Sequence, residues 1–240
     1  MPTLRAAALT DIGRVRRENE DRFVCDLNAM LFGVADGVGG LPSGGEAAEL
    51  AISELAEAMR AGPKHHEPNL TTVVQHVNTA VANLGLRVSP SMGIGTTLTF
   101  GWVSGGAMKL AHVGDSRCYV LRGSDLIRLT EDHSVENEAR LRRARGEVVY
   151  YHEANRNALT RCIGQPSRVD VDLVSRVLAT GDRYLFCTDG VTRMVGEHEL
   201  TEAMQKSNTP ESGVREIVTA ALDRGGLDNA TAVLVYVDEA

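Results

Sequence analysis

The stretch Leu31-Phe32-Gly33-Val34-Ala35-Asp36-Gly37 is an apolar, strand-like run that stops at an aspartate followed by glycine. Similar runs stop at Asp115 and Asp189, and a further run starts just after Asp228. A carboxylate at a strand end is held by a rigid sheet and projects past its edge, where it can meet water, metal or substrate. This repeated placement is typical of a site built at one end of a sheet.

The four carboxylates have two interpretations. Two carboxylates about 4 Å apart repel by roughly 4 kcal/mol at an effective dielectric constant near 20. Several of them converging on one point therefore need divalent cations between them. The alternative is that Asp-Gly and Asp-Asn are ordinary turn dipeptides. Four such placements in one chain favour the metal-binding interpretation.

Hydrophobic periodicity predicts an α+β chain. Apolar runs predict strands at 6–9, 22–26, 30–35, 96–103, 108–113, 118–121, 126–129, 170–178, 183–187 and 230–237. Apolar residues at helical spacing predict helices at 48–59, 70–84, 136–145, 197–206 and 210–223. A loop bracketed by prolines is expected over 61–68. Because strands and helices come in pairs without strict alternation, the order favours antiparallel sheets covered by helices.

Composition and charge disfavour several classes of protein. Hydrophobic residues make up 43% and charged residues 24% of the chain, as in an ordinary globular protein. The net charge of -7 and the lack of long basic blocks disfavour a nucleic-acid partner. The longest apolar run, 230–237, is too short to span a membrane, and residues 1–12 lack the pattern of a signal peptide. We therefore expect a cytoplasmic protein without a membrane partner.

The cysteines carry no signal of chemistry. Cys25, Cys118, Cys162 and Cys187 lie far apart without any CxxC spacing, which suggests neither a zinc site nor a disulfide framework. Reduced, mostly buried thiols are expected. Cys187 lies two residues before Asp189 but lacks the phosphate-cradling loop that follows a nucleophilic cysteine in covalent phosphatases.

Charged residues fill the segment 13–21, directly before an expected strand. A solvated turn explains them equally well in isolation. Beside metal-binding acids, an arginine here would serve a phosphate, because a guanidinium donates two hydrogen bonds to phosphate oxygens. The glycine-rich stretch 36–45 lacks the spacing of a nucleotide-binding loop. Its better use is to place the Gly37 carbonyl beside the Asp36 carboxylate, since hard oxygen ligands suit Mg²⁺ or Mn²⁺.

Eight short motifs follow one another in a characteristic order. They are Asn19-Glu20-Asp21, Val34-Ala35-Asp36-Gly37-Val38-Gly39-Gly40, Gly95-Thr96-Thr97, Val113-Gly114-Asp115-Ser116-Arg117, Leu129-Thr130-Glu131-Asp132-His133-Ser134, Asn157-Ala158-Leu159-Thr160-Arg161, Cys187-Thr188-Asp189-Gly190 and Asp228-Asn229-Ala230-Thr231. In this order they resemble the motifs of the metal-dependent type 2C Ser/Thr protein phosphatases, in their compact bacterial form. The resemblance covers nearly the whole chain, from Thr10 to Val237.

The resemblance implies a four-layer α-β-β-α sandwich of two antiparallel sheets, with a dinuclear Mn²⁺ or Mg²⁺ centre at one end. Asp36 would bridge both ions, and Asp189 and Asp228 would complete the first. The Gly37 carbonyl would serve the second ion. Such a pair of ions turns a bound water into a nucleophile at neutral pH and clamps a phosphoryl oxygen.

The resemblance also implies roles for the remaining site residues. Glu20 and Asp21 would act through metal-bound waters, and Asp115 with Asp189 would hold a weaker third ion. Arg16, five residues before Asp21, occupies the phosphate-binding position. The segment 134–161 would form a flap subdomain that helps to select the substrate.

One position departs from the family. Animal members carry a histidine directly after the Asp-Gly, proposed as the general acid for the leaving oxygen, and this chain has Val38 there. His133 and His152 are the candidate substitutes. A histidine beside a turn usually satisfies backbone groups, so a structural role is the favoured interpretation of both.

These residues together predict a single-domain enzyme over 1–240 that hydrolyses phosphoserine and phosphothreonine on proteins by direct attack of a metal-activated water. We expect a monomer that opposes a bacterial Ser/Thr kinase. Two alternatives belong to other classes: a non-catalytic phosphoprotein-binding regulatory module of the same fold, and a structural divalent-cation protein. The complete aspartate set argues against the first, and Arg16 argues against the second.

Overall fold

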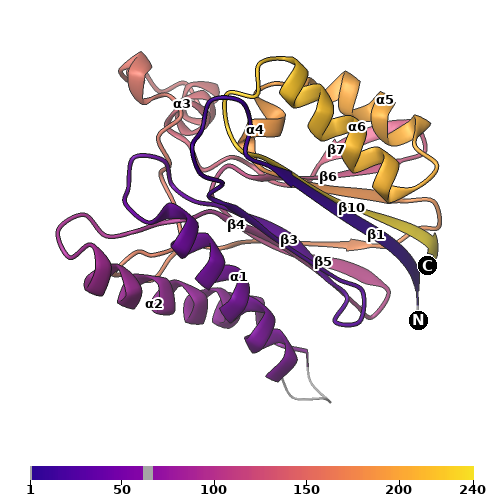
Figure 1. The fold of residues 1–240 in the computed structure, drawn as a ribbon, viewed down its shortest axis with the longest axis horizontal. Helices are drawn as coiled ribbons and strands as arrows, with labels where there is room; N and C mark the ends of the chain where they lie inside the picture. Colours follow the sequence, from indigo (N-terminus) through magenta and orange to yellow (C-terminus); the bar gives the residue numbers. More distant parts are fainter. Residues whose placement is uncertain (1, 62–66) are drawn as a thin grey trace.

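Two five-stranded antiparallel sheets pack face to face, and helices cover both outer faces (Figure 1). The computed structural model describes residues 2–61 and 67–240, so the loop expected over 61–68 lies mostly outside the described residues. The four-layer α-β-β-α sandwich confirms the fold class predicted from the sequence.

Each sheet is named after one of its inner strands, β3 or β10. The β3 sheet has the order β2-β3-β4-β5-β8. Its strands are β2 (Asp21–Asp26), β3 (Leu31–Asp36), β4 (Leu98–Ser104), β5 (Ala107–Val113) and β8 (Asp172–Val177). The β10 sheet has the order β1-β10-β9-β6-β7. Its strands are β1 (Thr3–Asp11), β6 (Arg117–Arg122), β7 (Asp125–Arg128), β9 (Arg183–Cys187) and β10 (Ala230–Glu239).

Each sheet is covered on its outer face by a pair of helices (Figure 1). The helices α1 (Gly44–Ala61) and α2 (Leu70–Val88) pack on the β3 sheet, and α5 (Glu197–Lys206) and α6 (Pro210–Asp223) pack on the β10 sheet. Two of these helices start with a side-chain cap: the Asn69 side chain caps α2, and Thr209 caps α6 ahead of a proline at its first turn. No helix within 2–61 and 67–240 is long and apolar enough to cross a membrane.

The run 31–35 is continuously apolar because β3 is covered on both faces. Leu31 and Ala35 pack toward α1 and α2, and Phe32 and Val34 pack between the sheets. The layer between the sheets also contains Phe186, which is fully buried. An added Cβ on Gly101 of β4 would fall 2.7 Å from the Phe186 ring, so a glycine lets this ring approach the opposite sheet.

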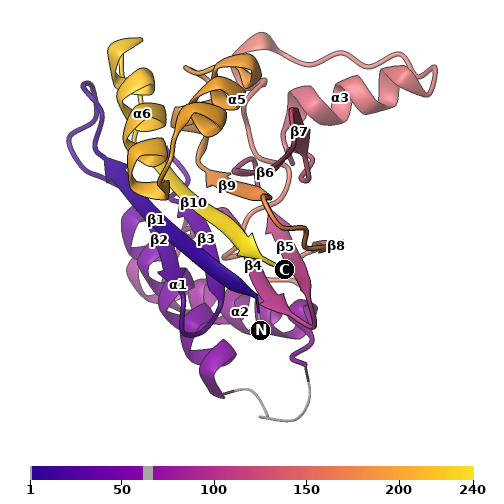
Figure 2. The same cartoon turned by 90° about the vertical axis from the view of Figure 1, so that its right-hand side faces the viewer.

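Two short helices lie at the end of the sandwich away from the chain termini (Figure 1). One is α4 (Asp189–Thr192), which the sequence pattern did not predict because a single turn is too short to show periodicity. The other is α3 (Val135–Ala144), within the segment 134–161. Figure 2 shows α3 projecting beyond the sheets next to β7. The remainder of the segment contains only a 3-10 turn at Glu153–Asn155.

We expect Phe186→Ala to lower the free energy of unfolding by about 3–5 kcal/mol, because it empties a fully buried position between the sheets. Urea unfolding followed by circular dichroism measures the change. Phe23→Ala is the matched control, since the Phe23 side chain on β2 is 37% exposed. Equal losses in the two variants would contradict the assignment of Phe186 to the central layer.

Candidate active site

Carboxylates from four strand ends meet in one pocket of about 690 Å³. Asp36 is the last residue of β3, Asp115 follows β5, Asp189 begins α4 after β9, and Asp228 precedes β10. Three further predicted residues line the same pocket: Arg16, Glu20 and Gly37. The structure thus brings together every predicted site residue except Asp21, which lies beneath the pocket.

The backbone of Asp36 is clamped by the Gly-Thr-Thr motif. The Thr97 N–H and the Thr96 hydroxyl both donate to the Asp36 carbonyl, at 2.8 and 2.9 Å. The Asp36 N–H donates in turn to the Thr97 hydroxyl at 2.9 Å. That hydroxyl lies 2.8 Å from the Ser116 hydroxyl, directly after Asp115. The motif therefore sets the separation between two of the carboxylates.

The two Asp-Gly pairs are not turn dipeptides. Gly37 forms an isolated bridge to Thr96, and Gly190 lies within α4. Neither glycine has a positive φ, and both are needed for space. An added Cβ on Gly37 would lie 2.4 Å from the Gly44 carbonyl carbon, and one on Gly190 would lie 1.9 Å from the Asn229 oxygen. The turn interpretation is therefore wrong at both positions, and the glycines allow close backbone packing around the carboxylates.

Asn229 joins the N-terminal loop to the start of β10. Its amide nitrogen donates to the carbonyls of Ile12 and Glu18 at 2.8 and 2.9 Å. Its side-chain oxygen accepts the Glu20 N–H at 2.8 Å. Asn229 thereby holds the loop that carries Arg16 and Glu20 against Asp228. Its place in the Asp-Asn-Ala-Thr motif was the only sequence signal for this role.

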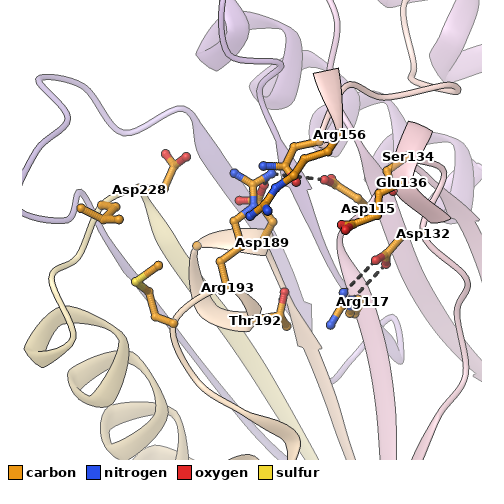
Figure 3. A pocket seen from close by; sticks show the side chains of 14 residues that line it. Asp115, Arg117, Asp132, Ser134, Glu136, Arg156, Asp189, Thr192, Arg193 and Asp228 are labelled. Atoms are coloured by element: carbon orange, nitrogen blue, oxygen red, sulfur yellow. Dashed lines mark hydrogen bonds and ion pairs between the residues drawn. The ribbon is translucent and has the colours of Figure 1, made fainter. Parts of the chain in front are cut away.

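Arginines pair with these carboxylates. Arg16 Nη2 donates to Asp228 Oδ2 at 2.8 Å. Arg193 contacts Asp189 and lies 3.7 Å from Asp115 Oδ2 (Figure 3). The sequence analysis missed Arg193, because only the single helical turn of α4 places it above Asp189.

Burial and mutual repulsion raise the pKa of the carboxylates. The pKa of Asp36 lies well above its ordinary value, first through burial and then through Asp21, Asp189 and Asp115. Burial and then Asp189 raise the pKa of Asp115 to about 7, against the opposing effect of Arg193. Burial likewise raises the pKa of Asp189. Each carboxylate therefore holds its negative charge at a cost that a nearby cation would remove.

Asp21 is buried below the pocket. Its Oδ2 accepts hydrogen bonds from the hydroxyls of Thr188 and Thr231, at 2.8 and 2.7 Å. Its Oδ1 is buried with no hydrogen-bond partner among the described residues. Burial raises the pKa of Asp21 to about 7 although both threonines oppose that shift. Thr188 and Thr231, which sequence reasoning did not single out, thus orient a carboxylate whose second oxygen remains available.

The donor set fits a hard divalent cation. The carboxylates and the Gly37 carbonyl supply oxygen ligands alone, which suit Mg²⁺ or Mn²⁺. The raised pKa values and the unpartnered Asp21 oxygen also indicate a site that favours positive charge. Among the described residues, no group of three or more His, Cys, Asp or Glu side chains is already arranged as a metal site.

The side chains of both candidate histidines form hydrogen bonds with backbone groups. His133 is buried; its Nδ1 accepts the Gly114 N–H at 3.0 Å, and its Nε2 lies 3.1 Å from Asp172 Oδ2. The proton is therefore on Nε2, and burial is the main cause that lowers the His133 pKa. His152 Nδ1 accepts the Ala154 N–H at the 3-10 turn. Neither residue lines the pockets that hold the aspartates, so the favoured structural role is confirmed.

The thiols near the site are protonated. All four cysteines are free, and Cys118 and Cys187 are buried. Burial raises the pKa of Cys187 to about 12 and that of Cys118 well above its usual value. Burial thus keeps both thiols protonated at neutral pH, which argues against Cys187 as a nucleophile.

A second pocket of about 510 Å³ extends the site toward the segment 134–161 (Figure 3). It shares Asp115, Asp189 and Asp228 with the first pocket. Ser134, Glu136 and Arg156 from the segment line its other side. A molecule bound at the aspartates would therefore lie next to this segment.

The known proteins that are similar to this chain are phosphatases. The family model for protein phosphatase 2C matches residues 14–223. The serine/threonine phosphatase stp of Listeria monocytogenes serotype 4b is 35% identical, over 95% of this chain and 94% of that protein. The serine/threonine protein phosphatase PstP of Mycobacterium tuberculosis is also 35% identical, over 98% of this chain but 45% of that protein. A crystal structure of the PstP catalytic domain with two manganese ions superposes with a TM-score of 0.83, at 32% identity and 98% coverage of both chains.

We expect Asp115→Asn to stabilise the protein in EDTA at pH 8. The folded state holds a proton on Asp115 up to about pH 7, whereas the ordinary carboxyl releases it near 3.8. Stability is therefore lost as the pH rises through this window, and the amide avoids the loss. At 1.36 kcal/mol per pKa unit, the gain is on the order of 2–4 kcal/mol at pH 8 and vanishes at pH 3.

Urea unfolding at both pH values measures this gain. The control is Asp132→Asn, because the Asp132 carboxylate accepts hydrogen bonds from Arg117 and Arg128 and its loss should destabilise the protein. A loss of stability at pH 8 in Asp115→Asn that equals the loss in Asp132→Asn would show that Asp115 is not repelled by its neighbours.

Proposed function

The chain belongs to the protein phosphatase 2C family and is a metal-dependent Ser/Thr protein phosphatase, and we propose that the pocket at the sheet ends is its catalytic centre. The observation that carries the proposal is the convergence of Asp36, Asp115, Asp189 and Asp228 from four separate strand ends. A catalytic role is favoured over a non-catalytic phosphoprotein-binding module, because a binder has no chemical use for repelling buried carboxylates.

We assign the metal ligands as follows. Asp36 would be shared by two ions, Asp189 and Asp228 would hold the first, and the Gly37 carbonyl would hold the second. Divalent ions bound there, Mn²⁺ or Mg²⁺, supply a water nucleophile at neutral pH and neutralise phosphate charge. The rigid backbone around Asp36 supports the bridging role, since Thr96 and Thr97 fix its position. Glu20 and Asp21 contribute through water; the unpartnered buried Oδ1 of Asp21 supports this role.

We assign phosphate binding to Arg16. Its side chain is 41% exposed at the pocket, so a phosphate can reach it. Its guanidinium already donates to the Asp228 carboxylate, which shows that it reaches an anionic oxygen at the centre. Two oxygens of a phosphate can accept a pair of hydrogen bonds from a guanidinium, as the two oxygens of a carboxylate can. Arg16 therefore orients the phosphoryl group beside the ligands of the first ion.

The leaving oxygen has no histidine to protonate it. Val38 lines the pocket where a general acid would stand, and none of the described residues that line the two pockets is a histidine. The enzyme should therefore depend on the acidity of the leaving group more than an enzyme with a general acid does. Aryl phosphates are favoured substrates for this reason.

Phosphorylated proteins are the proposed physiological substrates, and a Ser/Thr kinase acting on them is the proposed partner. We propose a cytoplasmic monomer with one catalytic domain over 1–240. The segment 134–161 is the proposed flap that selects the substrate; its supporting observation is the shared pocket between Glu136, Arg156 and the aspartates. The family resemblance implies a weaker third ion at Asp115 and Asp189, and in this chain Arg193 contacts both of these carboxylates.

We expect Asp36→Asn and Asp189→Asn each to lower Mn²⁺-dependent hydrolysis of p-nitrophenyl phosphate by at least 10²-fold with the fold retained, because each removes a charged metal ligand. Asp125→Asn, at an exposed position on β7, is the control and should keep full activity. Arg16→Ala should mainly raise KM, since phosphate binding is already made in the ground state. Activity within a few fold of wild type in either ligand variant would refute the assigned centre.

We expect replacement of residues 136–152 by a short Gly/Ser linker to impair turnover of a phosphothreonine peptide more than turnover of p-nitrophenyl phosphate. A flap orients the larger substrate, whereas the metal centre performs the chemistry on both. Steady-state kinetics on the two substrates measure the difference in kcat/KM. Equal losses on both would mean that the segment supports the metal site through its contacts near Asp115.

A further inference from the structure

Arg193 bridges two carboxylates of the site. Its guanidinium contacts Asp189 and lies 3.7 Å from Asp115 Oδ2 (Figure 3). Asp115 comes from the end of β5 in one sheet and Asp189 from the end of β9 in the other. One side chain thus places a positive charge beside two carboxylates that come from the ends of strands in different sheets.

The backbone fixes this position of Arg193. Its N–H donates to the Asp189 carbonyl at 2.8 Å, so the two residues lie four apart on one face of the α4 turn. The turn itself cannot shift, because Gly190 lies against the Asn229 backbone and Val191 is fully buried. Arg193 is therefore held above Asp189 by the same packing that holds the carboxylate.

The other arginines of the two pockets have different partners. Arg117 pairs with Asp132, Arg156 pairs with Glu153, and Arg16 pairs with Asp228. Among the described arginines that line these pockets, Arg193 is thus the one that contacts both Asp115 and Asp189. The side chains of Asp115 and Asp189 are only 12% and 13% exposed, so solvent screens their charges weakly.

We propose that Arg193 is a built-in cation of the Asp115–Asp189 position, which keeps a third divalent ion from binding there, so that the protein holds two divalent ions. This inference rests on the proposed function. A guanidinium is always charged, and here it forms ion pairs with both carboxylates, so it neutralises them without depending on metal concentration. A third ion would have to bind beside this positive charge or displace it, and either lowers its affinity.

Mn²⁺ binding to the chelator-treated full chain tests the proposal, by equilibrium dialysis with metal analysis. Wild type should bind two Mn²⁺ per chain. Arg193→Gln, which removes the charge and keeps a polar amide, should bind a third at least tenfold more tightly than wild type does. Arg193→Lys keeps the charge and should remain at two. The double variant Arg193→Gln with Asp115→Asn should lose the third ion again.

Arg156→Gln is the matched control, because Arg156 lines the same pocket but pairs with Glu153. It should bind two Mn²⁺, like wild type. Melting curves in EDTA establish that each variant folds, and Arg193→Met is the second neutral variant if Arg193→Gln does not. Binding of the first two ions tests the proposed metal centre, and binding of a third ion tests the role of Arg193. The proposed centre and the role of Arg193 can therefore fail separately.

Binding of two Mn²⁺ per chain in both wild type and Arg193→Gln would refute the role of Arg193 without contradicting the proposed metal centre. Three Mn²⁺ of equal affinity in both would overturn it as well. Fewer than two in wild type would refute the proposed centre and the inference together. A third ion that survives Asp115→Asn would place the new site elsewhere and also overturn the inference.

Discussion

Mutual repulsion of buried carboxylates is the constraint on which this structure depends. Burial and neighbouring charge raise the pKa of Asp36, Asp115 and Asp189, so bringing them together costs stability. Such a cost persists only where the surrounding backbone holds the groups in place. Here Thr96 and Thr97 clamp Asp36, and Gly190 brings the Asp189 backbone against that of Asn229. A site that favours positive charge is the chemical result.

The sandwich explains how the carboxylates are held against that repulsion. Each comes from a different strand end, and the strands belong to two sheets whose facing sides interlock through fully buried residues such as Phe32 and Phe186. Helices on the outer faces cover both sheets, so the sheets are rigid on both sides. The site therefore takes its geometry from the two central layers, while α3 of the segment 134–161 projects beyond the sheets (Figure 2).

Arginines counter the negative charge in two different ways. Arg16 lies on the N-terminal loop, with 41% of its side chain exposed, and pairs with Asp228 at the side of the pocket. Arg193 is attached to a packed helical turn and spans Asp115 and Asp189. The two side chains are similarly exposed, at 41% and 38%, so they differ in how they are attached and in the carboxylates that they contact. Arg16 is the proposed phosphate ligand, and Arg193 is the proposed built-in cation.

The sequence by itself determined the fold class, the main strands and helices, and the aspartates of the site, because apolar periodicity and ordered motifs are local properties of the chain. It also indicated that His133 and His152 support backbone and that the thiols are inert. Only the tertiary structure decided which atoms meet. The one-turn helix α4, the bridge made by Arg193, the threonines that hold Asp21 and the close packing at Gly190 join residues that are distant in sequence or too few to show a period. Such contacts depend on how the two sheets pack against each other, and a local sequence pattern does not encode which distant residues that packing brings together.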